Sequence, residues 1–296
     1  MTTTKQKLYA QKLRAITKRF NRMESDTVKS ALELLEQLRR DISVELLADG
    51  NTEYNTRRLQ ILKENIGELV TGFESQMLKL TGESVKATHV LGGASVIDTA
   101  TAAGIRGLFF KPTPSQVNIL VDFSADLITN ITQDMLKSIN SSLTRGVLGQ
   151  KNTLDVMKEI TDILGTRAGK DLVKGVAGRA EKIYRTELGR VFELSAESQR
   201  QIAKELEPDL QKGWVATGDS RTRETHLAAH GQIVGVDDAF VVGGEELHHP
   251  KDPGGSAKNT IYCRCTTVTI WPEIGVIETP QDRRIKREQA KRELAT

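Results

Sequence analysis

The sequence predicts a mainly α-helical protein with a smaller α+β domain in its C-terminal part. Long stripes of apolar residues at steps of three and four fill the first half of the chain, which is typical of amphipathic helices. Short β-branched and aromatic runs begin at Lys212, where the chain also becomes rich in turn residues. Hydrophobic residues make up 38% of the 296 residues but aromatic residues only 4%, so we expect a core of aliphatic side chains.

Two long helices are predicted in the N-terminal part. The first carries an apolar stripe over residues 8–42, and Asp49-Gly50 is a suitable end because glycine accepts the left-handed conformation after a helix. The second stripe covers residues 59–80 and is expected to end at Thr81-Gly82. A short connection between two amphipathic helices predicts an antiparallel hairpin, whose apolar faces pack on each other, on later helices or on a partner.

Residues 83–115 are expected to be irregular, because they contain helix-breaking residues. These are Gly92, Gly93, Gly104, Gly107, Pro112 and Pro114. A helical pattern returns over residues 117–143 and again over residues 154–164, where Thr153 is a candidate N-cap. Several glycines after this helix indicate a soft domain boundary near residue 178.

The C-terminal part is predicted to contain one more helix, over residues 180–198, followed by short strands. The strand candidates are Lys212–Thr217, Gln232–Val236, Ala239–Val242 and Ile261–Trp271. Residues 282–296 indicate a short, exposed, mildly basic helix. We therefore expect a helical region over residues 1–178, either one domain or an extended arm, then an α+β domain over residues 179–275 and a basic tail over residues 276–296.

Composition and motifs exclude several classes of protein. The formal net charge of +3 argues against a dedicated nucleic-acid-binding domain. The two cysteines, Cys263 and Cys265, lie one residue apart, which rules out a disulfide-stapled secreted domain and favours a reducing cytoplasm. No apolar run is long enough to span a membrane, and no P-loop, GxGxxG, HExxH or GxSxG motif is present. We expect a soluble protein without an ordinary nucleotide-binding or hydrolase site.

A group of histidines and cysteines in the C-terminal domain predicts a metal site. His226 and His230 are spaced i, i+4, which places them on one face of a helix, and Cys263 and Cys265 share one face of the last strand candidate. Imidazole and thiolate are zinc ligands, and four of them complete a structural Zn²⁺ site. Two metal-free arrangements stay open: histidine hydrogen bonds with the cysteines packed as small apolar groups, and a strained Cys-x-Cys disulfide.

Charged residues near this group have structural and functional interpretations. In Asp219-Ser220-Arg221-Thr222-Arg223, Ser220 or Thr222 could cap the following helix, and the arginines would pair with carboxylates or reach an anion. Arg185 and Glu187, on the preceding helix, are expected to form ion pairs within the domain. A catalytic role of Glu187 is the alternative.

These motifs form an ordered series over roughly residues 180–271. Its members are Arg185, Glu187, Trp214, Asp219, Arg221, Thr222, His226, Gly231, Pro250, Asp252, Cys263, Arg264 and Cys265. The series resembles the phage Mu F-like head morphogenesis family, the minor head proteins of tailed bacteriophages. The family often has Asn-Cys-Arg-Cys, whereas this chain has Tyr262 before Cys263, so the amide has no counterpart here.

The resemblance implies a structural protein, not an enzyme, that is built into the procapsid in few copies. Its partners would be the portal protein and other head proteins, such as the major capsid or scaffold protein. The N-terminal helices would make these contacts or mediate self-association. The protein would act in genome packaging or ejection, inside the head of the virion after assembly in the host bacterial cytoplasm.

The resemblance also raises two further expectations. Four basic residues of the tail are candidates for contact with packaged double-stranded DNA: Arg283, Arg284, Lys286 and Arg287. A solvated helix is the alternative for this tail. Because Mu F-like domains occur beside toxin or transferase domains in larger phage proteins, an ADP-ribosyltransferase-like enzyme using Arg185 and Glu187 is the alternative function.

Overall fold

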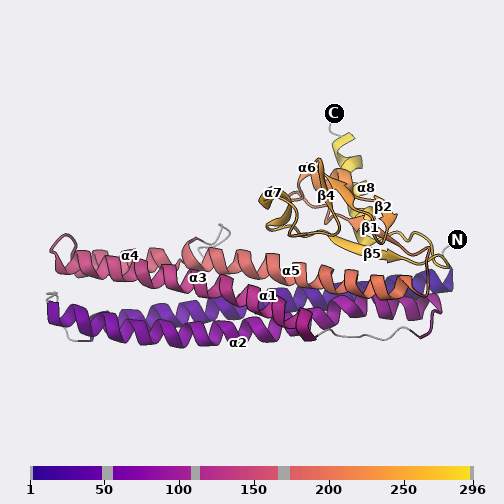
Figure 1. Cartoon of the computed structure of the whole chain (residues 1–296). Coiled ribbons are helices and arrows are strands. Elements are labelled where there is room, and N and C mark those ends of the chain that lie inside the picture. The colour runs from indigo at the N-terminus through magenta and orange to yellow at the C-terminus, as the bar shows by residue number, and fades with distance from the viewer. Residues whose placement is uncertain (1–2, 49–55, 108–113, 166–173, 294–296) are drawn as a thin grey trace. The chain divides into compact units, whose positions relative to one another are not determined.

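The computed structural model describes residues 3–48, 56–107, 114–165 and 174–293. It confirms the predicted fold class, with long helices followed by short antiparallel strands (Figure 1). The long helices are α1 (Thr4–Leu47), α2 (Thr56–Ala103), α3 (Pro114–Val147), α4 (Thr153–Leu164) and α5 (Gly175–Lys204). The predicted stop at Asp49-Gly50 lies outside the described residues.

The chain forms two compact units, and neither is one continuous stretch of sequence. Unit 1 contains residues 1–22, 86–117 and 186–296, and unit 2 contains residues 23–85 and 118–185. The helices α1, α2, α3 and α5 each contribute residues to both units. The sequence predicts successive regions divided near residue 178, whereas these compact units are interleaved along the chain.

Unit 2 is a bundle of parts of α1, α2, α3 and α5 with the whole of α4 (Figure 1). Its core is largely aliphatic, as the low aromatic content predicts. Buried members include Leu35, Leu38, Ile42, Ile66, Val70, Met77, Ile128, Ile131 and Ile139. Polar bonds also join neighbouring helices: the Glu74 carboxylate accepts from Thr132 at 2.6 Å, and the hydroxyls of Thr81 and Tyr184 lie 3.0 Å apart.

The helix α2 does not end at Thr81-Gly82, as the sequence predicts, but continues to Ala103. It passes through Gly82, Gly92 and Gly93, which were expected to break it. A glycine costs a helix only about 1 kcal/mol relative to alanine, so tertiary packing can outweigh it. Gly92 has such a packing role, because an added Cβ would lie 2.3 Å from the carbonyl oxygen of Phe192 on α5. The glycine allows α2 and α5 to approach closely within unit 1.

Gly92→Ala is expected to destabilise unit 1 by about 2–3 kcal/mol, because the new methyl group overlaps backbone atoms that cannot move away. The matched control is Gly72→Ala, in the same helix, where nothing lies within 4 Å of the added Cβ. This control should gain up to about 1 kcal/mol from helix propensity. Equilibrium denaturation of both variants measures the contrast. Equal effects in the two variants would contradict the close approach.

Unit 1 contains a three-stranded antiparallel sheet in the order β2-β1-β5. The strands are β1 (Gln211–Val215), β2 (Ile233–Gly235) and β5 (Thr266–Ile270), and Trp214 pairs with Thr267 in the register. A separate hairpin joins β3 (Phe240–Val242) and β4 (Glu245–Leu247). The sequence predicts β1, β2 and β3 within two residues but does not predict β4.

Short helices complete unit 1: α6 (Glu224–Ala229), α7 (Ala257–Thr260) and α8 (Pro280–Glu293). The predicted strand Ile261–Trp271 is wrong in its first half, because β5 begins only at Thr266. Instead, the Cys263 amide closes a turn onto the Thr260 carbonyl at 3.2 Å, and Tyr262 has a positive φ of 56°. This left-handed conformation is disfavoured for a bulky residue and easier for asparagine.

Residues far apart in the sequence close the core of unit 1. The Tyr9 hydroxyl on α1 donates to the Thr269 carbonyl on β5, and the Trp271 indole N–H donates to the Thr99 hydroxyl on α2 at 3.3 Å. Trp271 is fully buried in a cluster with Tyr9, Val96, Ala100 and Ala196. Unit 1 therefore depends on the first part of α1 and the second part of α2 as much as on its sheet.

Candidate functional site

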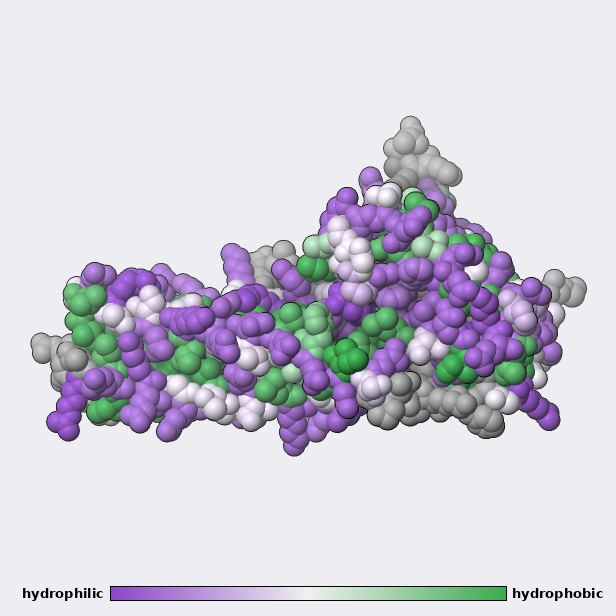
Figure 2. Space-filling model, viewed as in Figure 1, coloured by the Kyte–Doolittle hydropathy of each residue, from purple (hydrophilic) through white to green (hydrophobic). Residues whose placement is uncertain are grey.

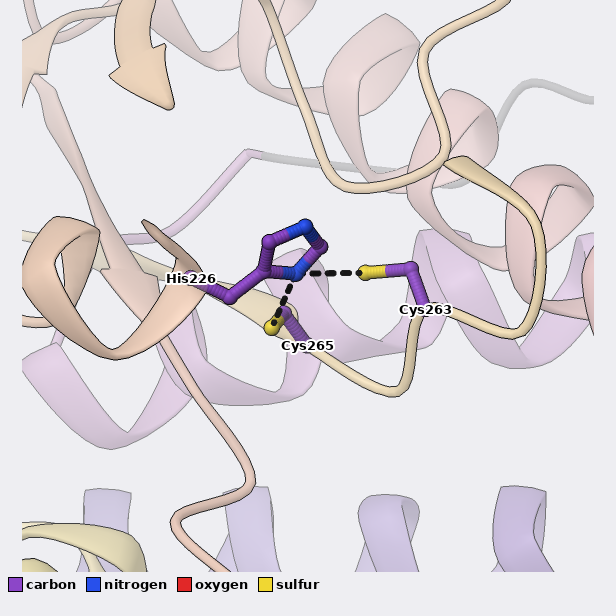
Figure 3. Close-up of side chains that lie close together, drawn as sticks. All are labelled: His226, Cys263 and Cys265. Atoms are coloured by element: carbon purple, nitrogen blue, oxygen red, sulfur yellow. Dashed lines mark hydrogen bonds between the residues drawn. The ribbon is translucent and has the colours of Figure 1, made fainter. Parts of the chain in front are cut away.

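Three chemically reactive side chains meet inside unit 1 (Figure 3). His226 comes from α6, and Cys263 and Cys265 come from the loop before β5. The His226 Nδ1 atom lies 3.4 Å from the Cys265 sulfur and 3.5 Å from the Cys263 sulfur. The three donor atoms lie within 4.8 Å of one another, and all three residues are buried. Both cysteines are free thiols, so the disulfide alternative is not what the structure shows.

The surrounding chain holds these three residues in position. Arg223, the residue before α6, donates to the Ile261 carbonyl at 2.6 Å and so links α6 to the cysteine loop. Thr217 donates to the Arg264 carbonyl at 2.8 Å, between the two cysteines. The Trp214 ring meets the His226 ring edge to face, with centroids 6.0 Å apart. The side chains of His226, Cys263 and Cys265 are therefore held in place by contacts from β1, α6 and the loop before β5.

His230 does not join this group, contrary to the four-ligand prediction. The i, i+4 argument assumed one continuous helix, but α6 ends at Ala229 and His230 has an extended ψ of 130°. Its ring binds elsewhere: Nδ1 accepts from the Ala216 amide at 3.3 Å, and Nε2 lies 2.9 Å from the Asp282 carboxylate. The structure thus brings together three of the four predicted ligands.

The two thiols have opposite electrostatic environments. Contact with Cys265, helped by His226 and the Lys251 ammonium, lowers the pKa of Cys263 well below the usual value of a thiol. The same contact, together with burial, raises the pKa of Cys265 well above it. The Lys251 ammonium is itself buried and donates to the Cys265 carbonyl at 3.2 Å. The site therefore favours one thiolate and one thiol when no metal is bound.

An ion pair closes the loop beside the cysteines. The Arg264 guanidinium donates to both oxygens of Asp219, at 2.5 and 2.6 Å. The same carboxylate accepts from the Arg221 amide and the Thr222 hydroxyl, each at 3.1 Å. Hydrogen bonding from Arg264 is the main reason that the pKa of Asp219 is far below its usual range. The predicted capping of α6 by Ser220 or Thr222 is wrong, because the N-cap residue is Arg223 and no side-chain hydrogen bond caps the helix.

Asp219→Asn is expected to cost about 1–2 kcal/mol at neutral pH, because a bidentate, partly buried pair is lost. The folded-state pKa of Asp219 is depressed, so the stabilisation is present above its ordinary pKa and is lost as the pH falls. The difference between wild type and variant should shrink below about pH 4. Denaturation measured across this pH range tests the prediction. The control is Glu246→Gln, which removes an exposed carboxylate on β4. A pH-independent difference would contradict the assignment.

Other members of the predicted series build turns around the site. Gly231 has a positive φ of 83° and its amide donates to the Trp214 carbonyl at 2.9 Å. Asp252 accepts from the His248 amide at 2.7 Å and the Gly254 amide at 2.8 Å. The Pro250 carbonyl contacts the buried His249 ring at 3.0 Å. The Arg221 side chain is largely exposed.

Arg185 and Glu187 each form ion pairs with partners of their own. Arg185 belongs to unit 2, where it pairs with Glu181 at 2.9 Å and Glu24 at 3.0 Å. Glu187 belongs to unit 1 and is buried, with Arg190 at 2.6 Å. Burial raises the pKa of Glu187, and Arg190 opposes that shift. Glu187 pairs within the predicted domain of residues 179–275, whereas Arg185 pairs both within it, with Glu181, and outside it, with Glu24.

Sequence reasoning missed a buried charged network in unit 1. The Arg200 guanidinium donates to Glu197 at 2.6 Å, and Lys212 donates to the other oxygen of Glu197 at 2.8 Å. The fully buried Glu193 accepts from the Thr267 amide and hydroxyl, at 3.2 and 2.5 Å. Glu193, Glu197 and Arg200 are spaced i, i+4, i+7 and therefore lie on one face of a helix. This spacing is the sequence feature that could have indicated the network.

The tail is the helix α8, and it begins as a packed part of unit 1. Ile285 is buried, and its side chain occupies the space that a Cβ at Gly218 would need. All four basic candidates on this helix are exposed: Arg283, Arg284, Lys286 and Arg287. Glu278 pairs with Lys286 at 2.9 Å and lies 3.7 Å from Arg283.

Comparisons with known proteins agree with part of this picture. Residues 137–268 match the model of the family described as Phage Mu protein F like protein. A stretch of 92 residues is 38% identical to the NAD(+)–arginine ADP-ribosyltransferase EFV of Enterococcus faecalis (strain ATCC 700802 / V583), and it covers 31% of this chain. The chain spans only 19% of the length of that relative. No solved structure matches.

The family match confirms the resemblance predicted from the motif series. The matched residues include every member of that series, from Arg185 to Cys265. The family indicates a phage head protein with a structural role. In the part of the chain that the structure describes, no helix is both long and apolar enough to cross a bilayer.

Proposed function

Because residues 137–268 are Mu F-like, and this family indicates a phage head protein, we propose that the chain is a minor head protein of a tailed bacteriophage. In this proposal it joins the procapsid in few copies and associates with the portal. It then acts in packaging or delivery of the genome, inside the head of the virion after assembly in the host cytoplasm. The single observation that carries the proposal is the family match.

The surface of unit 2 suits contact with other head proteins. Hydrophilic side chains predominate on the face in Figure 2, and hydrophobic ones form separate patches along the helices. Large apolar side chains of unit 2 are exposed: Val44, Leu47, Ile61, Leu148 and Leu154. A groove of about 690 Å³ between α1 and α2 is lined in part by Leu38, Leu69 and Phe73. Such faces accept an amphipathic helix of a partner or of a second copy.

The charge distribution supports a limited contact with DNA. A net charge of +3 gives no strong attraction to a nucleic acid as a whole. The basic side chains of α8 form a local candidate surface, although Glu278 neutralises part of it. We therefore assign contact with packaged DNA to Arg284 and Arg287 first, with Arg283 and Lys286 secondary.

The copy number in purified heads tests the proposal, measured by quantitative mass spectrometry against the portal protein. A fixed number at or below the number of portal subunits is the expected result. Ile61→Glu should lower this number, because it places a charge on an exposed apolar position of α2, whereas the control Gln60→Glu should not. Absence of the chain from every head preparation would refute the proposal.

A second candidate function rests on the relative in Enterococcus faecalis, which is named as an NAD(+)–arginine ADP-ribosyltransferase. The shared stretch is a small share of that enzyme, so its activity need not reside there. Incubation of the chain with NAD⁺ and an arginine-containing protein acceptor tests this function. ADP-ribose transfer that Glu187→Gln abolishes would support it, and no transfer by the wild type would remove it.

A further inference from the structure

One nitrogen faces two sulfurs in the group of His226, Cys263 and Cys265. An imidazole Nδ1 has either one lone pair or one proton in the ring plane, so it can complete only one good hydrogen bond at a time. Both sulfurs nevertheless approach it almost equally, at 3.4 and 3.5 Å. Figure 3 shows the two thiols and the ring nitrogen directed toward one another. Hydrogen bonding alone therefore leaves one of the two contacts unexplained.

The same distances fit a metal ion at the centre of the group. Zn²⁺ lies about 2.0–2.1 Å from a histidine nitrogen and about 2.3 Å from a thiolate sulfur. At a tetrahedral angle these bonds separate nitrogen and sulfur by about 3.5 Å. The observed nitrogen–sulfur separations of 3.4 and 3.5 Å match this value.

The second ring nitrogen of His226 makes no comparable contact with the described residues. His226 Nε2 is buried, and no residue in the described part of the chain forms a hydrogen bond with it. The polar interactions of this ring are therefore concentrated on the sulfur side. A ring bound to a metal through Nδ1 would carry its proton on Nε2, a single tautomer.

We propose that His226, Cys263 and Cys265 bind one Zn²⁺ through Nδ1 and the two sulfurs. Both sulfurs bind as thiolates, the remaining thiol proton is released to solvent on binding, and the two thiolates neutralise the charge of the ion. Among the described residues no fourth histidine, cysteine or carboxylate lies within the group, so the remaining coordination position takes water.

Zinc in this position would act on the fold of unit 1. The ion would connect α6 to the loop that leads into β5, two segments otherwise joined by hydrogen bonds such as Arg223 to Ile261. The nearby Lys251 ammonium, bound to the Cys265 carbonyl, would keep the loop in place without being a ligand. The zinc proposal and the proposed head function are tested by separate experiments. A head protein without zinc and a zinc-binding protein absent from heads are distinguishable results.

Metal analysis of the full chain, purified under reducing conditions without added zinc, tests the proposal. The expected content is about one equivalent of zinc per chain. Cys263→Ser, Cys265→Ser and His226→Gln should each reduce it below about a tenth of an equivalent. The matched control is His230→Gln, a neighbouring histidine outside the group, which should keep its zinc.

A second measurement does not depend on the variants folding. Zinc is removed from the wild-type chain with a chelator, and Co²⁺ is titrated in while the visible spectrum is recorded. Intense d–d bands and thiolate-to-cobalt charge-transfer bands, saturating near one equivalent, are expected for a tetrahedral site with two thiolates. Less than about a tenth of an equivalent of zinc in the wild type, with no cobalt bands, would overturn the proposal. A stoichiometric metal other than zinc would overturn the assignment to Zn²⁺.

Discussion

Arg200→Met is expected to destabilise unit 1 by about 3–5 kcal/mol, because it leaves the buried Glu193 without its main compensating charge. The Arg200 side chain is only 1% exposed, and it bonds to Glu197, Thr267 and Thr269. Tryptophan fluorescence during denaturation measures the loss in unit 1 alone, because both tryptophans, Trp214 and Trp271, belong to that unit.

The pH dependence of this variant gives a second check. Burial raises the pKa of Glu193, and Arg200 is the main group that opposes the rise. Without Arg200 the folded-state pKa should rise further. Stability is then greatest when Glu193 is protonated in both states and falls as the pH rises through its folded-state pKa. The deficit of Arg200→Met should therefore be smaller at acidic pH than at neutral pH.

A double variant separates this charge effect from general damage. In Arg200→Met with Glu193→Gln no buried carboxylate is left unpaired, so the combined loss should be less than the sum of the two single losses. Additive losses, or a single-variant loss below about 1 kcal/mol, would contradict the assigned role of Arg200.

Trp271→Ala is expected to destabilise unit 1 by about 3–5 kcal/mol, because it removes the largest side chain from a fully buried cluster. The substitution leaves a cavity beside Tyr9 and Val96 and also removes the donor to Thr99. The remaining Trp214 still reports unfolding of the unit by fluorescence.

Two controls accompany Trp271→Ala. Trp271→Phe keeps an aromatic ring but removes the N–H donor, and should cost about 1–2 kcal/mol. Val276→Ala, at a position 64% exposed in the same unit, should stay within about 0.5 kcal/mol of the wild type. A loss in Trp271→Ala no larger than in Val276→Ala would show that Trp271 is not part of the core.

Periodicity predicted the helices well and their ends less well. The stripes over residues 117–143 and 154–164 correspond to α3 and α4. The predicted end of α2 was wrong by about twenty residues. Gly82 and Gly92 disfavour a helix only weakly, and tertiary packing, which the sequence does not show, outweighs that effect. The N-cap of α4 is Asn152, one residue before the predicted Thr153, and its side chain accepts from the Asp155 amide.

The residue types of the candidate site could be predicted from the sequence, but their arrangement in space could not. His226, Cys263 and Cys265 were predicted together because they are metal-ligand types within a short stretch. His230 was included wrongly because spacing within a helix has no meaning beyond the end of the helix. The charged network around Arg200 was missed because its partners, Lys212 and Thr267, lie on strands that only the fold brings to α5.

The interleaved order of the units has a consequence for synthesis of the protein. Unit 2 has all its segments once Arg185 has emerged from the ribosome, whereas the bond from Tyr9 to Thr269 joins residues 260 positions apart. The first turns of α1 must therefore wait for β5 before unit 1 can close, which makes its folding late during translation. A nascent chain that stops before β5 lacks the strand that completes the sheet. Only copies translated beyond Ile270 contain the whole Mu F-like segment together with all of β5.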